Sequence, residues 1–210
     1  MSVAEMKPVR SARKAKGEGH ARRGEILEAA QRIFVECGYE GATIRKIADE
    51  VGVSSTALYM HFRDKSEILH EICEGAFDSL RKNHVAIIER PIPAREKVRA
   101  ILEAFMDFGF DNPNAYSLVF LTRPSEAQEG AVNVAQRLGK DVFAIFQGCV
   151  DELADEGRLK TDPKIAGQTL WAGCHGIVAL IITKPYFDWA DRRALTQTML
   201  DALFEGLTRQ

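Results

Sequence analysis

The stretch GYEGATIRKIADEVGVSSTALYMHFRDKSEIL, residues 38–69, decides the fold of the N-terminal part of the chain. Thr43 and Ser54 each precede apolar residues with helical spacing, and both side chains are of the type that caps a helix N-terminus. Gly52 lies between the two segments and can adopt the positive φ of a tight turn. Two short helices joined by a glycine-containing turn predict a helix-turn-helix.

A further helix is expected before this stretch, which makes the N-terminal part a three-helix domain. Its apolar residues recur every three or four positions, and the pattern stops at Gly38, a typical C-terminal glycine. The expected inward-facing residues of the three helices are Ile26, Leu27, Ala30, Ile33, Phe34, Cys37, Ile44, Ile47, Ala48, Val51, Leu58 and Phe62.

The last of these helices is expected to expose polar and aromatic side chains. Leu58 and Phe62 define its buried side, because residues four apart share a helix face. Hydroxyls, a phenol and an imidazole on the other faces suit a helix in the major groove of DNA. Arg45 can reach a guanine with two hydrogen bonds, and Lys65 can hold a phosphate. The candidate DNA-binding residues are Thr43, Arg45, Ser54, Ser55, Thr56, Tyr59, Met60, His61 and Lys65.

The same side chains raise the alternative of a Ser/His hydrolase. Ser54 is expected to turn its hydroxyl to the backbone as a cap, and Ser55, six residues before His61, does not share a helix face with it. No G-x-S-x-G motif occurs. His70 and Cys73 are three residues apart but have no third ligand nearby. The sequence therefore predicts no enzyme, no metal site and no cofactor.

Charged residues are distributed unevenly along the chain. Residues 1–65 hold 12 Lys and Arg against 9 Asp and Glu, whereas the remainder holds 16 against 21. Residues 1–20 lack apolar periodicity and predict a disordered basic arm, which either binds nucleic acid or is a solvated tail. The longest apolar run, Trp171–Ile182, is shorter than the ~20 residues of a membrane span, and the four cysteines form no C-x-x-C pair. We expect a cytoplasmic protein with buried free thiols and no membrane partner.

From Lys65 onward the apolar spacing stays helical and no alternating strand pattern appears, so the predicted fold is all-α with about nine helices. Pro and Gly residues separate the expected elements, and Asp162 before Pro163 is a good helix start. The helices are expected near 65–89, 94–109, 114–122, 126–155, 163–183 and 189–207.

The N-terminal motifs resemble the DNA-binding domain of the tetracycline-repressor (TetR) family of bacterial regulators. The matching elements are the helix end at Phe34–Gly38, Gly41-x-Thr43, the turn from Ile47 to Ser54, and Leu58-Tyr59-x-His61-Phe62-x-x-Lys65. The resemblance implies that Thr43, Tyr59, His61 and Lys65 contact phosphate or the groove wall. It implies that Arg45, Ser55, Thr56 and Met60 are the variable readers of the operator. Thr56 and Met60 depart from the residues common at these positions.

The C-terminal part resembles, over residues 156–180, a sub-group with a Trp-His-Gly signature, here Trp171, His175 and Gly176. The resemblance implies three parts: a basic arm at 1–20, the helix-turn-helix domain at 21–66, and a regulatory, ligand-binding and dimerisation domain at 67–210. The resemblance also implies a central effector cavity. Some of the aromatic residues on the surrounding helices must instead belong to the hydrophobic core. The candidate pocket residues are Phe105, Phe108, Tyr116, Phe120, Phe143, Phe146, Trp171 and His175.

In this family the last two long helices pair with their copies in a second subunit. Small residues near 172–176 permit close helix approach, and an i, i+4 apolar stripe follows on the last helix, although such a stripe also suits plain core. The candidate dimer residues are Ala172, Gly176, Leu195, Met199, Leu203 and Leu207.

The sequence as a whole predicts a ligand-responsive transcriptional regulator. Its expected partners are a palindromic double-stranded DNA operator, a second copy of the chain, and a small apolar or amphipathic effector that releases the DNA. Repression is the expected mode, with activation by the same fold as the alternative. A nonspecific RNA or membrane-surface binder fits less well, since a helix-turn-helix favours duplex DNA and no basic amphipathic helix follows.

Overall fold

The computed structural model describes residues 19–121 and 129–209, and the side chains of residues 21–121 and 135–209. Most of the expected basic arm, and positions 122 and 126–128 of two expected helices, lie outside the described residues. Within the described part the chain is helical, and its extended pairing is limited to one isolated bridge between Leu159 and Thr208. The all-α prediction is confirmed. The chain divides into two compact units between Ile68 and Leu69.

The first unit is a three-helix domain followed by the start of a long helix. Its elements are α1 (Gly19–Gly41), α2 (Ile44–Val51), α3 (Ser55–Tyr59) and the first residues of α4 (Lys65–Ile88). The helical geometry of α1 is interrupted at Gly38, where φ is 70°, so the predicted stop marks a kink and one more turn follows. Ile26, Ile47, Leu58 and Phe62 form the centre of its core.

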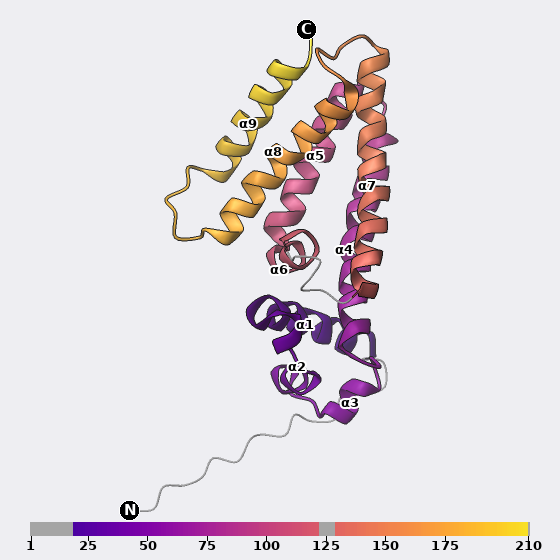
Figure 1. Cartoon of the computed structure of the whole chain (residues 1–210), viewed down its shortest axis with the longest axis vertical. Coiled ribbons are helices and arrows are strands. Elements are labelled where there is room, and N and C mark those ends of the chain that lie inside the picture. The colour runs from indigo at the N-terminus through magenta and orange to yellow at the C-terminus, as the bar shows by residue number, and fades with distance from the viewer. Residues whose placement is uncertain (1–18, 122–128, 210) are drawn as a thin grey trace, which may run out of the picture. The chain divides into compact units, whose positions relative to one another are not determined.

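The second unit is a helical bundle arranged around α5 (Figure 1). Helix α5 packs against α7 and α8, α7 packs against α8, and α9 lies on α8. The remaining elements are the rest of α4, α5 (Ala94–Asp111), α6 (Pro113–Tyr116), the π-helical turn η1 (Ser117–Leu121), α7 (Glu129–Asp155), α8 (Pro163–Thr183) and α9 (Arg192–Leu207).

Most helix ends lie at or within two residues of those expected. Asp162 caps α8 by accepting from the backbone N–H groups of Lys164 and Ile165, which confirms the predicted start. The expected helix at 189–207 begins later, at Arg192, because Asp191 caps it by accepting from the backbone N–H of Ala194, and Trp189 before it packs at a tilt against Phe187. The expected helix at 114–122 is a short α-helix that continues into the π-helical turn.

The core of the second unit is apolar and closely packed. Gly109 of α5 permits a close approach of apolar side chains, since a Cβ there would lie 2.5 Å from a methyl carbon of Val178 and 2.8 Å from the ring of Tyr116. Side chains of α5, α7, α8 and α9 share this core, with Val98, Ile101, Leu102, Phe146, Val150, Leu170, Cys174, Leu200 and Phe204 at its centre. Three of the cysteines are buried as expected, but Cys37 is exposed.

Candidate nucleic-acid interface

The turn between α2 and α3 is built by three residues of the opening stretch. The Thr43 hydroxyl caps α2 by accepting from the backbone N–H of Lys46 at 3.2 Å. Gly52 ends α2 with φ of 74°, a conformation that a Cβ would strain. The Ser54 hydroxyl caps α3 by accepting from the backbone N–H of Ala57 at 3.1 Å. The predicted caps and turn are confirmed, and Ser54 is committed to the backbone of its own helix.

Helix α3 is fixed by two buried side chains and presents others to solvent. Leu58 and Phe62 are 0% and 1% exposed, although Phe62 lies beyond the end of α3. Tyr59 and Met60 are adjacent and are 55% and 85% exposed. Thr56 is also exposed. The expected recognition face is therefore an open surface.

Three of the predicted contact residues, Ser55, His61 and Lys65, are only partly exposed. The carbonyl oxygen of His61 accepts a hydrogen bond from the guanidinium of Arg23 on α1. That guanidinium also lies 4.0 Å from the ring centroid of Phe62 and 4.0 Å from the Glu67 carboxylate. Arg23 therefore ties α1 to the segment between α3 and α4, a role that its place in the basic front of the sequence does not indicate.

Lys65 has an intramolecular role that the sequence did not indicate. Its ammonium donates to the carbonyl oxygens of Tyr39 at 2.8 Å and Ala42 at 3.3 Å. It also lies 4.2 Å from the ring centroid of Tyr39, and burial raises the pKa of that phenol. Lys65 therefore holds the end of α1 against the start of α4, and a phosphate contact would add to this role or compete with it.

Arg45 and Arg63 are the more accessible cations near the turn. Their side chains are 86% and 87% exposed, and each lies beside one carboxylate one helical turn away. Lys46, by contrast, donates to the carbonyl oxygen of Gly41 at 2.8 Å. Exposed ion pairs contribute at most about 1 kcal/mol, so a phosphate can replace them. Arg63 was missed by the sequence reasoning, although its place directly after Phe62 was a usable signal.

The start of α4 is held by reciprocal capping. The Asp64 carboxylate accepts from the backbone N–H of Glu67 at 2.9 Å, and the Glu67 carboxylate accepts from the backbone N–H of Arg63 at 2.7 Å. The second bond holds the pKa of Glu67 below its ordinary value. Two orphan donors of the helix start are thereby satisfied, which fixes the turn that carries Arg63.

In the second unit, the predicted pocket residues meet in a chain of ring contacts. Tyr116 and His175 are its polar centre, with 2.6 Å between the phenol oxygen and Nδ1. Burial raises the pKa of Tyr116 and lowers that of His175, so both side chains are neutral near pH 7 and the hydrogen bond joins two uncharged groups. The ring contacts also join Phe105, Phe120, Phe143, Phe146 and Trp171.

Some of these pocket candidates are packed as core. Phe105, Phe108, Tyr116 and Phe146 are buried, whereas Phe120, Phe143 and His175 are partly exposed and Trp171 is 37% exposed. A hollow of about 420 Å³ lies elsewhere, between α4 and α7. Its lining is Glu71, Glu74, Gly75, Phe77, Asp78, Arg81, Leu138, Asp141 and Val142, none of them a predicted pocket residue.

The candidate dimer residues divide between the inside and the outside of the unit. Leu195, Met199, Leu203 and Leu207 are only partly exposed, and the last three pack against the unit's own core. Ala172 is exposed, and a Cβ added at Gly176 would meet no atom within 4 Å. An exposed stripe on α9 lies one residue before each of these four apolar residues, at Ala194, Thr198, Ala202 and Gly206.

The remaining histidine and cysteine candidates do not converge. The Nδ1 atom of His70 lies 3.5 Å from the Glu74 carboxylate, and Cys73 is buried. Among the described residues no group of three His, Cys, Asp or Glu side chains could hold a metal ion. One described helix, α8, is long and apolar enough to cross a membrane by length and composition, and 28% of its apolar stretch is buried in the chain.

Two family models match the chain. One, described as bacterial regulatory proteins of the tetR family, matches residues 26–72. The other, described as a tetracyclin repressor-like C-terminal domain, matches residues 98–203. The narrower Trp-His-Gly sub-group is not confirmed by these matches.

Curated relatives and solved structures agree with these matches. The transcriptional activator FasR of Mycolicibacterium smegmatis is 35% identical over 112 residues, 51% of each chain. The transcriptional repressor KstR2 of Rhodococcus jostii is 35% identical over 145 residues, 67% of this chain and 69% of the relative. The match thus spans about half of FasR and more of KstR2. The solved structure of the ketosteroid transcriptional regulator KstR2 of Mycobacterium tuberculosis superposes with a TM-score of 0.77 at 21% identity, covering 90% of this chain and 96% of that one.

Proposed function

Because the chain belongs to the tetR family of bacterial regulatory proteins, we propose that it regulates transcription by binding a DNA operator through α2 and α3. The observation that carries this proposal is the open face of α3, where Thr56, Tyr59 and Met60 are exposed around a buried Leu58. The named relatives are regulators of transcription rather than enzymes. A Ser/His hydrolase is further disfavoured because the Ser54 hydroxyl is used as a helix cap.

Within this interface we assign two kinds of contact. Arg45, Thr56 and Met60 lie where base edges can be reached, and they set the operator sequence. Thr43, Tyr59 and Arg63 supply phosphate contacts that position the helix. A regulator of this kind acts on the bacterial chromosome, so the proposed location is the cytoplasm.

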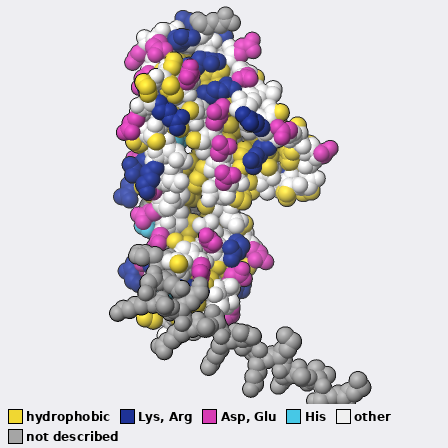
Figure 2. Space-filling model, turned by 180° about the vertical axis from the view of Figure 1, so that it is seen from behind, with side chains coloured by type: hydrophobic (Ala, Val, Ile, Leu, Met, Phe, Trp, Pro, Cys, Tyr) yellow, Lys and Arg dark blue, Asp and Glu magenta, His cyan; other side chains and the backbone are white. Residues whose placement is uncertain are grey.

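The proposed active form is a homodimer joined through the outer faces of α8 and α9. Apolar side chains gather on the α8–α9 hairpin, which projects to the right in Figure 2, and Leu180, Tyr186 and Phe187 are exposed there. Small residues at Ala172 and Gly176 of α8, and the exposed stripe of α9, allow two helix pairs to approach closely. A two-fold dimer buries the same face of both copies and presents two α3 helices to successive major grooves, about 34 Å apart.

The proposed effector is a small apolar or amphipathic molecule that binds at the aromatic cluster. Apolar rings surround a single polar pair, Tyr116 and His175, and this is the usual make-up of a small-molecule site. The Mycobacterium tuberculosis structure shows the fold alone, but that protein is a ketosteroid transcriptional regulator, which makes a ketosteroid the first probe. Helix α4 runs from Lys65 in the first unit to Ile88 in the second and is the natural lever between effector and operator.

Repression is the proposed mode of regulation. An effector that favours a conformer unable to span the operator releases the DNA, and this is the simplest consequence of the proposed layout. Activation is the second candidate, because the relatives include a named activator, FasR, as well as the named repressor KstR2.

Selection of bound duplexes from a random DNA pool tests the DNA-binding proposal. The full chain is expected to enrich a two-fold symmetric site, and Tyr59→Ala is expected to lose that enrichment. Val35→Ala is the matched control, because Val35 is an exposed apolar residue of α1 outside the proposed interface. Failure of the wild-type chain to enrich any sequence, or equal enrichment by the Tyr59 variant, would contradict the assignment.

The effector proposal has its own optical test. The chain holds two tryptophans, so a Trp189→Phe variant leaves Trp171 as the only source of tryptophan fluorescence. The Trp171 ring stacks on the His175 ring, with 5.5 Å between the ring centroids. A ketosteroid is expected to change this emission saturably and to release the selected duplex over the same concentration range. Tyr116→Phe should weaken both effects. An emission change without release would place the ligand at this cluster but remove its regulatory role.

A further inference from the structure

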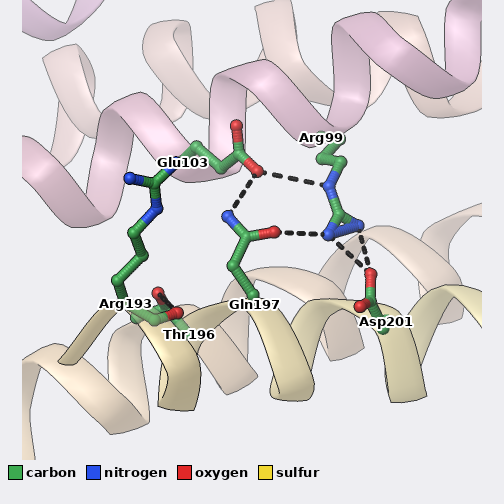
Figure 3. A network of polar contacts seen from close by, with 6 residues as sticks. All are labelled: Arg99, Glu103, Arg193, Thr196, Gln197 and Asp201. Carbon is green, nitrogen blue, oxygen red and sulfur yellow. Dashed lines mark hydrogen bonds and ion pairs between the residues drawn. The ribbon is translucent and has the colours of Figure 1, made fainter. Parts of the chain in front are cut away.

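A polar network joins α5 to α9 (Figure 3). The Arg99 guanidinium donates from both terminal nitrogens to Oδ1 of Asp201, at 2.8 and 2.6 Å. It also donates to Oε1 of Gln197 at 2.9 Å and, through Nε, to Oε1 of Glu103 at 3.2 Å. The Gln197 amide closes the ring by donating to the same Glu103 oxygen at 3.1 Å. We call these four residues the Arg99 network.

The Arg99 network fixes the register of α9. Helix α9 packs most closely on α8, and its buried face towards the core includes Leu200 and Phe204. The burial of these side chains is not directional in itself, so sliding and rolling of the helix are resisted by their close packing together with directional bonds such as those of the Arg99 network. Hydrogen bonds of 2.6–3.2 Å are directional, and a slide of α9 by one residue, about 1.5 Å, would break them.

The geometry of the network matches this role. Arg99 and Glu103 are one turn apart on α5, as are Gln197 and Asp201 on α9, so the contact constrains both rotation and translation. The Arg99 side chain is 21% exposed and that of Asp201 is 69% exposed, so solvent screens this ion pair in part. Further along the same helix pair, Arg192 of α9 stacks 4.6 Å from the ring centroid of Phe110 of α5. The Arg95 guanidinium of α5 also lies 4.8 Å from the ring centroid of Phe204 of α9, so α9 is held to α5 at several points.

The network also decides which face of α9 points outward. Gln197 and Asp201 face α5, and the next residue in each case, Thr198 and Ala202, belongs to the exposed stripe proposed as the dimer face. Successive residues of a helix are rotated by about 100° around its axis. Holding Gln197 and Asp201 against α5 therefore also fixes the direction of Thr198 and Ala202. A roll of α9 would turn the stripe and change how two copies meet.

We propose that Arg99 is a positioning residue for operator recognition, which sets the half-site spacing by holding α9 in one register. This inference rests on the proposed function, because it requires a dimer joined through α8 and α9 that reads two half-sites. In such a dimer the separation of the two reading helices depends on how the interface helices sit on their own subunits. Loss of the network would relax the spacing, whereas a purely structural role would weaken binding to all sites alike.

The test is selection from a random duplex pool with wild type, Arg99→Met and the control Arg81→Met, followed by measurement of half-site spacings. Arg99→Met keeps the apolar stem but removes the hydrogen-bonding fork. Arg81 is a suitable control because it forms an ion pair with Asp78 that lies within α4. Wild type and Arg81→Met are expected to select one spacing. Arg99→Met is expected to select several, with the preference for the wild-type spacing over its one-base-pair neighbours reduced about tenfold or more.

Three results would overturn the inference. Selection of the wild-type spacing alone by Arg99→Met, with uniformly weaker binding, would show a structural role only. If Arg99→Met fails to fold by circular dichroism, Asp201→Ala replaces it, because Asp201 is largely exposed and accepts two of the bonds. An unchanged spacing with that variant would overturn the inference equally. A wild-type chain that selects no two-fold symmetric site would instead refute the proposed function, and this inference with it.

Discussion

Removal of one buried imidazole should change how the stability of this protein depends on pH. His84 of α4 is 3% exposed. Burial lowers its pKa from 6.5 to about 4, and the backbone of Val142, which acts in the opposite direction, does not compensate. The folded chain therefore keeps this ring neutral under mildly acidic conditions in which the unfolded chain protonates it. The perturbation is His84→Leu, which removes the titrating group and keeps an apolar side chain.

The sign and size of the effect follow from proton linkage. Between pH 6.5 and 4 the unfolded state binds more protons at this position, so stability falls as pH falls through that window. A pKa difference between 6.5 and about 4 corresponds to roughly 3 kcal/mol once both states are protonated, and to about 2 kcal/mol at pH 5. The contribution is fully present above pH 6.5.

The assay is urea unfolding of wild type and His84→Leu at a series of pH values from 7.5 to 5. Wild type is expected to lose about 2 kcal/mol more than the variant over this range. Asn83→Leu is the matched control, because Asn83 is the exposed neighbour on the same helix and does not titrate. Equal losses in wild type and His84→Leu would refute the reasoning, because the imidazole would then be as easily protonated in the folded chain as in the unfolded one.

Three further substitutions test the site and the interface. Arg45→Ala is expected to cost about 1–3 kcal/mol on the selected operator and to relax its sequence, measured by competition binding; a uniform loss on all duplexes would show a phosphate contact only. Lys65→Met should lower the free energy of unfolding by about 1–3 kcal/mol, because two carbonyls lose their donor. An unchanged salt dependence of DNA binding in that variant would exclude the predicted phosphate role. Gly206→Leu should raise the dimer dissociation constant at least about tenfold by sedimentation, while Gly148→Leu, at an equally open position on α7, should not.

The sequence predicted the helix-turn-helix well because local chemistry determines it. The capping hydroxyls of Thr43 and Ser54 bond to backbone groups that lie within four residues in the sequence, and Gly52 turns the chain at its own position. Their roles can therefore be predicted from the sequence alone. Helix periodicity depends equally on local spacing, and the ends of α4, α8 and the C-terminal end of α9 lie at or within one residue of the predicted positions.

The partners of long side chains, and the partner of each apolar helix face, were harder to predict. Lys65 and Arg23 reach backbone carbonyls 26 and 38 residues away, and only the tertiary structure brings those groups within range. On α9 the spacing of apolar residues predicted that Leu203 lies on a face that packs against something. The spacing could not show whether that face packs against a helix of the same chain or against a second chain. In the structure Leu203 packs against its own unit, beside Gly173 of α8, and the exposed residue is Ala202.

The mass of the complex on a selected duplex shows directly whether two copies of the chain read one operator. Sedimentation of the full chain with a selected operator, combined with footprinting of both strands, measures how many chains bind and where. The account predicts two chains per duplex and two symmetric protected segments in successive major grooves, with centres about 34 Å apart. One chain per duplex, or a single unsymmetrical protected segment, would contradict it.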